Sequence, residues 1–159
     1  MEPDIEKHKN SARLFLRNHP LGTLATMGED GMPQLAAVYF LPEDDFTCFF
    51  VTKESTRKYA NISRQPIATF LSFDESALVS IELTGSVALV TDLAEVAKAI
   101  TAFQKLAETR SAGYWVPPVS KVAGSQFVVC KLVPTMVNFN NFSLRSDEQG
   151  IPQQMSFKL

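Results

Sequence analysis

The chain has 159 residues, a length that suits a single domain with one sizeable hydrophobic core. Its formal net charge of −2 argues against a general electrostatic attraction to nucleic acid or to anionic lipid. No run approaches the roughly 18 apolar residues of a membrane span, and residues 1–10 are too polar for a signal peptide. We therefore expect a cytoplasmic protein with no nucleic-acid partner and no membrane association.

The first half of the chain predicts one helix and three antiparallel strands. Apolar residues recur at helical spacing over 3–18, and Pro20 stops that helix. The apolar runs that follow predict strands at 21–27, 32–41 and 46–52. Asp30-Gly31 lies between the first two runs and is a strong hairpin signal, because glycine accepts positive φ without steric cost.

The second half adds two helices and four strands. A short helix over 55–64 begins with Ser55 as its cap, and a longer helix at 93–110 follows Asp92. Gly85 predicts a bulge in its strand. The expected strands are 66–73, 77–92, 125–133 and 135–140, the last two divided at Pro134.

Many strands and few helices predict a mainly β (α+β) fold in the form of a closed or partly closed antiparallel barrel. The heavy use of Phe, with 12 copies, agrees with a strand-rich chain. We expect the barrel domain to cover 1–140 and a polar C-terminal tail to cover 141–159.

The segment 51–62 carries the most informative chemistry. It places Arg57-Lys58 at the start of the short helix, where cations are unfavourable because of the helix dipole. A bound phosphate would compensate, since helix N-termini offer free N–H groups and Arg binds phosphate through two parallel bonds. The hydroxyls of Thr52, Ser55 and Thr56 would complete such a site. On these residues alone, a solvated helix start is the alternative.

An ordered series of motifs surrounds this segment. The pieces are Leu24-Ala25-Thr26, Asp30-Gly31-Met32-Pro33, Ala37-Val38-Tyr39-Phe40, Phe49-Phe50-Val51-Thr52, Thr56-Arg57-Lys58 and Gln65-Pro66. In this order and spacing they resemble the flavin-binding split-barrel family, typified by pyridoxamine 5′-phosphate oxidase and the general stress proteins. The resemblance extends over roughly residues 10–138.

The resemblance implies a six-stranded antiparallel split β-barrel with flanking helices. It also implies a homodimer that binds FMN in two clefts at the interface. Carried over by position, Arg57 and Lys58 would bind the FMN phosphate, and Thr52 and Thr56 would support them.

The same resemblance places the flavin ring along the strand Ala36-Ala37-Val38-Tyr39, with Val51 near the ring or the ribityl chain. Ser80 stands where the oxidase has a ring-contacting Gln, so this contact is not carried over intact. The oxidase's C-terminal Trp, R-x-H substrate grip and final R-L-x-P have no counterpart in this chain. The chain is therefore not expected to be a true pyridoxamine phosphate oxidase.

We expect an FMN-binding oxidoreductase that acts on a small molecule, and no residue is named as its catalytic acid or base. One alternative is a non-enzymatic flavin-binding or stress-response protein. Another is the same barrel with a deazaflavin or haem. Haem favours an axial His or Cys, and the two histidines, His8 and His19, both lie near the N-terminus.

Few other residues suggest chemistry. Cys48 and Cys130 lie in apolar runs and are expected to be buried thiols. No cluster of Cys or carboxylates accompanies the histidines, so no metal site is expected. Tyr114-Trp115 precedes two prolines in a stiff loop, which we interpret as packed on the barrel, with a lid over the cofactor as the alternative.

Overall fold

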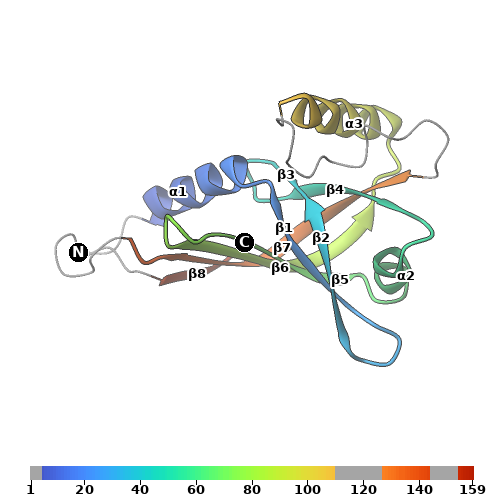
Figure 1. Ribbon diagram of the computed structural model, residues 1–159, viewed down its shortest axis with the longest axis horizontal. Helices are drawn as coiled ribbons and strands as arrows, with labels where there is room; N and C mark the ends of the chain where they lie inside the picture. The colour runs from blue at the N-terminus through green and yellow to red at the C-terminus, as the bar shows by residue number, and fades with distance from the viewer. Residues whose placement is uncertain (1–4, 110–126, 144–153) are drawn as a thin grey trace.

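The computed structural model describes residues 5–109, 127–143 and 154–159. One curled antiparallel sheet dominates it, with the strand order β2-β1-β5-β6-β7-β4-β3 and β8 paired to β7 (Figure 1). The helices are α1 (Ile5–Asn18), α2 (Arg57–Arg64) and α3 (Leu93–Glu108). The strands are β1 (Leu21–Met27), β2 (Pro33–Tyr39), β3 (Leu41–Pro42), β4 (Cys48–Lys53), β5 (Ile67–Asp74), β6 (Val79–Leu89), β7 (Phe127–Asn141) and β8 (Gln154–Lys158).

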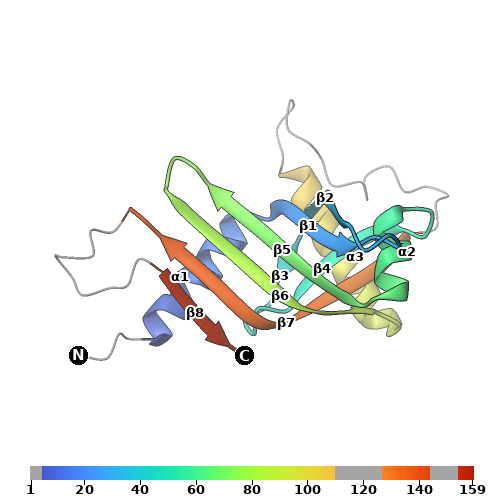
Figure 2. The ribbon, with the colours of Figure 1, turned by 90° about the horizontal axis from the view of Figure 1, so that it is seen from below.

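The mainly β class and the antiparallel split-barrel architecture are confirmed, with eight strands in the described chain where six were expected. The predicted hairpin joins β1 to β2, and Gly31 takes a φ of 76° in its turn. The segment expected to be a tail contains β8, which pairs with the second half of β7 (Figure 2). No described helix is long and apolar enough to cross a membrane.

Two apolar clusters lie on the two sides of β4, because successive strand residues point to opposite faces. The larger cluster fills the curled sheet. Its centre is aromatic, with the rings of Phe40 and Phe70 3.8 Å apart and those of Phe40 and Phe50 5.3 Å apart. The smaller cluster lies under α3, where Phe103 packs against Phe49 and its neighbours.

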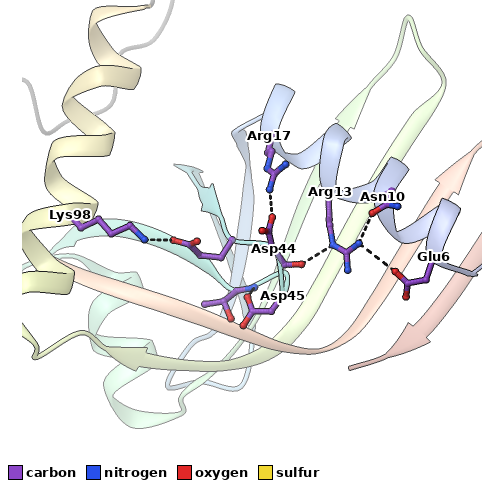
Figure 3. A network of polar contacts seen from close by, with 9 residues as sticks. Glu6, Asn10, Arg13, Arg17, Asp44, Asp45 and Lys98 are labelled. Atoms are coloured by element: carbon purple, nitrogen blue, oxygen red, sulfur yellow. Dashed lines mark hydrogen bonds and ion pairs between the residues drawn. The ribbon is translucent and has the colours of Figure 1, made fainter.

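Polar contacts attach α1 and α3 to the turn between β3 and β4 (Figure 3). Arg13 donates through Nε to the carbonyl oxygen of Asp44 at 2.7 Å, and Arg17 pairs with the Asp44 carboxylate. From the other side, Lys98 of α3 approaches Glu43 at 3.3 Å. These exposed pairs each contribute at most about 1 kcal/mol, so they orient the helices more than they stabilise the fold.

The strand division expected at Pro134 is wrong, because β7 is continuous from Phe127 to Asn141. Pro134 lies opposite Gly85, where the β6–β7 register shifts. The bulge was expected in the strand of Gly85, but the extra residue is Thr135, so the bulge lies in β7. It also lies where β7 exchanges β4 for β8 as its second neighbour. The missing N–H of proline therefore falls at an interruption of the ladder, where it costs little.

The two cysteines are confirmed as buried free thiols. Burial raises the pKa of Cys130 to about 12, and burial also raises the pKa of Cys48. Both side chains therefore stay protonated and serve as small apolar groups in the core.

Candidate functional site

The helix α2 begins at Arg57, and its cap is Thr56 rather than the expected Ser55. Thr56 Oγ1 accepts from the backbone N–H of Tyr59 at 3.3 Å and donates to the carbonyl oxygen of Lys53 at 2.8 Å. The Thr52 hydroxyl lies 2.9 Å from Thr56 Oγ1. Because the Thr56 hydroxyl donates its one hydrogen to the Lys53 carbonyl oxygen, Thr52 is the donor in this pair. The two hydroxyls therefore hold the loop and the cap together.

A pocket of about 170 Å³ opens beside this helix start. It is lined by Thr26, Gln34, Leu35, Ala36, Thr56, Arg57 and Lys58. No described residue accepts a hydrogen bond from the backbone N–H of Arg57 or Lys58. Two free N–H groups and the positive end of the helix dipole thus lie beside the pocket, which suits an anion.

The two cations of the pocket lack carboxylate partners among the described residues. Burial lowers the pKa of Lys58 from its ordinary value, and a smaller interaction with Cys130 opposes this shift. A half-buried, unpaired ammonium has lost part of its hydration without a compensating charge. An anion in the pocket would supply that charge.

Three polar residues from separate elements meet below the pocket. Asn61 of α2 is 5% exposed and Thr26 of β1 is 4% exposed. Asn61 Nδ2 donates to Thr26 Oγ1 at 3.0 Å and to Gln34 Oε1 at 3.1 Å. None of these three residues was expected at the site from the sequence. The available signal was a polar residue two positions after the buried Leu24, on the same inward face of a strand.

The structure brings Arg57, Lys58, Thr56 and Ala36 together around the pocket, and Thr52 joins them through Thr56. The other residues expected at the cofactor lie outside its lining. Ser55 and Ala37 are exposed to solvent, and Val38 belongs to the larger core. Val51 and Tyr39 pack in the cluster under α3. The Ser80 hydroxyl oxygen accepts a hydrogen bond from the Asn140 side chain at 3.2 Å. Five residues separate Ser80 from Gly85 along β6, and a strand of that length spans about 17 Å.

The family model described as pyridoxamine 5′-phosphate oxidase matches residues 9–139. The chain belongs to the pyridoxamine 5′-phosphate oxidase family. No curated protein matches the sequence. The match spans the elements that build the pocket, from β1 to the end of α2.

Solved structures share this fold at low sequence identity. A heme binding protein from Mycobacterium smegmatis has a TM-score of 0.72 at 17% identity, over 94% of this chain and 57% of its own. A putative pyridoxamine 5′-phosphate oxidase from Listeria innocua has a TM-score of 0.64 at 19% identity, over 86% of this chain and 99% of its own. A protein related to general stress protein 26 from Clostridium acetobutylicum has a TM-score of 0.66 at 14% identity, over 97% and 96%.

This family member also has a larger cavity of about 880 Å³ between α1, α3 and the β3–β4 turn. The cations that line it are already paired, as Arg17–Asp44, Lys98–Glu43 and Lys131–Glu95. This cavity therefore offers no spare positive charge to a phosphate, and the smaller pocket is the better anion site.

In the described part of the chain, no three His, Cys, Asp or Glu side chains gather. His19 is engaged on both ring nitrogens, with the Phe15 carbonyl oxygen and the Asp74 carboxylate, each at 3.0 Å. His8 is buried on α1. The loop with Tyr114-Trp115 lies outside the described residues.

Proposed function

We propose that the protein is an FMN-binding flavoprotein and acts as an oxidoreductase on a small molecule. The pocket beside α2 carries this proposal. It combines two unpaired cations, two free backbone N–H groups and buried polar side chains, which together suit the phosphate of FMN. The bound flavin would supply the hydride chemistry, and the protein would bind and orient it.

The size of the pocket supports a position of the flavin ring outside it. At about 170 Å³ the pocket suits a phosphate group, whereas pockets for whole drug-sized ligands begin at about 300 Å³. The ring would therefore extend from the pocket along β2, an edge strand whose outer backbone groups are free to bond a polar ring edge. Leu35 and Ala37 are exposed on that strand and would form an apolar wall.

A second copy of the chain would complete the site as a homodimer. The outward face of the three adjacent strands β2, β1 and β5 carries large exposed apolar side chains, and Leu35 among them also lines the pocket: Leu35, Ile67, Leu71 and Phe73. Contiguous exposed apolar surface is uncommon on monomers and marks an interaction site. A symmetric partner on this face would cover the ring from the side that one protomer leaves open.

Haem is a weaker candidate for this chain, although a structural neighbour is a heme binding protein. The two cysteines are fully buried, His19 is held by Asp74, and His8 is buried on α1, away from the pocket lining. A deazaflavin with a phosphate would use the same pocket. A non-enzymatic flavin protein would also use it, and turnover with a reduced nicotinamide and candidate acceptors separates this reading from an enzyme.

The test is the visible spectrum of the purified protein, followed by titration with FMN and with riboflavin. We expect flavin absorbance that bleaches with dithionite, and FMN binding that Arg57→Ala weakens by about 10–100-fold. Riboflavin has no phosphate, so its affinity should not change in this variant. Lys105→Ala removes an equal charge from the exposed face of α3 and should leave FMN binding intact. A colourless protein that takes up no FMN would refute the proposal.

A further inference from the structure

The hydrogen-bond directions below the phosphate pocket set which of its groups can donate. The Asn61 amide nitrogen carries two hydrogens, and each is directed to an oxygen, one on Thr26 and one on Gln34. The Thr26 oxygen is thereby used as an acceptor, and no described residue accepts its hydroxyl hydrogen. The Gln34 amide has its oxygen turned to Asn61, and its nitrogen lies beside Gly28 in the β1–β2 turn.

We propose that Asn61 is a positioning residue that makes Thr26 a hydrogen-bond donor towards the phosphate pocket, and so selects a fully ionised phosphate over a neutral group. This inference rests on the proposed phosphate site. Thr26 and Gln34 both line the pocket together with Arg57 and Lys58, while Asn61 itself does not. Asn61 therefore acts on the ligand through the Thr26 hydroxyl.

Burial makes this arrangement effective. Asn61 and Thr26 are both almost inaccessible, so water does not compete for their hydrogen bonds, and a fixed bond is stronger in such surroundings. The unmatched hydrogen of Thr26 carries a cost in free energy that an oxygen of a bound ligand would remove. The three residues come from β1, β2 and α2, and thus join the strand hairpin to the helix whose start forms the cationic wall.

The pocket lining therefore contains hydrogen-bond donors and cations, and it suits a ligand group that only accepts hydrogen bonds. A phosphate monoester offers three oxygens with no hydrogen to place when it is a dianion. The terminal hydroxyl of riboflavin is neutral and would leave most of these donors unmatched, which is how a polar site rejects a ligand that lacks the expected group. Asn61 thereby becomes a determinant of the preference for FMN over riboflavin.

The experiment measures FMN, riboflavin and inorganic phosphate binding by titration calorimetry for Asn61→Asp. A carboxylate at this position only accepts, so Thr26 would turn its hydroxyl hydrogen to it and away from the pocket. We expect the dissociation constants of FMN and of inorganic phosphate to rise by about 100-fold and that of riboflavin to change by less than about 2-fold. An equal loss for FMN and riboflavin would show a merely structural role and overturn the inference.

A double-mutant cycle separates positioning from the added charge. Thr26→Val removes the hydroxyl at nearly constant volume, and Asn61→Leu replaces the amide with an apolar side chain of the same branching and larger volume. Each should weaken FMN binding by about 10-fold, and the double variant should be little weaker than Thr26→Val, because Asn61 acts through that hydroxyl. Fully additive losses would overturn the inference.

Four further outcomes keep the inference distinct from the proposed function. If Asn61 variants do not fold, Thr26→Ser should keep FMN affinity while Thr26→Val loses it, and equal affinities would refute the role of the donor. If the wild type binds FMN through Arg57 but Asn61→Asp binds it equally well, the inference fails and the function stands. If the wild type binds inorganic phosphate and no flavin, the proposed function is refuted. The phosphate titration of Asn61→Asp then still tests the role of Asn61. Binding of neither refutes both.

Discussion

Gly85 and Pro134 face each other across β6 and β7 at a distance that leaves no room for a side chain. A Cβ atom at Gly85 would lie 2.1 Å from the Val133 carbonyl oxygen and 2.5 Å from the Pro134 Cα atom. Both obstacles are backbone atoms, so a rotamer change cannot relieve the overlap. The bulge that lets β7 pass from β4 to β8 therefore requires glycine at this position.

We predict that Gly85→Ala lowers the free energy of unfolding by about 3 kcal/mol, because the two strands must separate to admit the methyl group. Chemical denaturation followed by circular dichroism measures this change. Ser86→Ala is the matched control, since Ser86 is the exposed next residue, and it should change stability by less than about 0.5 kcal/mol. Equal effects of the two variants would show that the close approach is not maintained in solution.

Thr56→Val should destabilise the protein by about 1 kcal/mol, because it removes the cap of α2 and the partner of Thr52. It should also weaken FMN binding, since the free N–H groups at Arg57 and Lys58 depend on this helix start. Thermal unfolding and FMN titration measure the two effects. Ser55→Ala is the control at the adjacent position. A larger loss of stability in Ser55→Ala than in Thr56→Val would show that Ser55 is the cap.

The stability of the protein in acid should depend on Asp74. Hydrogen bonds from the Ser76 hydroxyl and the Ala77 backbone, with further help from His19, hold the pKa of Asp74 at about 2, below its ordinary 3.8. Because the unfolded chain binds the proton more tightly, this carboxylate stabilises the fold fully above about pH 3.8 and loses that effect as the pH falls through about 2.

We expect Asp74→Asn to be less stable than the wild type at pH 5, and the difference to shrink as the pH is lowered towards 2. Urea unfolding at a series of pH values measures the difference. Glu75→Gln controls for the loss of one negative charge at an exposed neighbouring position. A difference that stays constant from pH 5 to pH 2 would contradict the assignment.

Phe73→Lys should convert the proposed dimer to a monomer. Phe73 is 64% exposed on the apolar face that includes Leu35, which is 69% exposed, and a charge there would be desolvated by a second copy. Analytical ultracentrifugation measures the change in mass. Leu93→Lys is the control, since Leu93 is 82% exposed but lies at the start of α3. A monomeric wild type, or equal masses for wild type and Phe73→Lys, would exclude this interface.

Much of the fold could be predicted because it follows from local chemistry. Positive φ at Gly31 marks the β1–β2 hairpin, and Gly85 in an apolar run marks the bulge. The run 77–92 is rich in β-branched residues and forms the long strand β6. The cationic pair Arg57-Lys58 is visible as an unfavourable choice at a helix start, and both residues line the pocket.

Other features depend on partners that are distant in the chain. The local sequence allows either Ser55 or Thr56 to cap the helix. Thr56 is the cap because its hydroxyl forms hydrogen bonds with the Thr52 hydroxyl and the Lys53 carbonyl oxygen. Pro134 divides a strand when it is considered alone, but the bulge opposite Gly85 accommodates it within β7.

The sequence by itself therefore determined the β-rich class, the hairpin, the position of the register shift at Gly85 and the cationic half of the candidate site. The tertiary structure alone decided the neutral half, where Asn61 meets Thr26, 35 positions earlier, and Gln34, 27 positions earlier. Backbone preferences and charge act between near neighbours and leave a mark on the local sequence. The direction of a buried hydrogen bond depends on strand register and helix docking, which are set only when distant segments pack together.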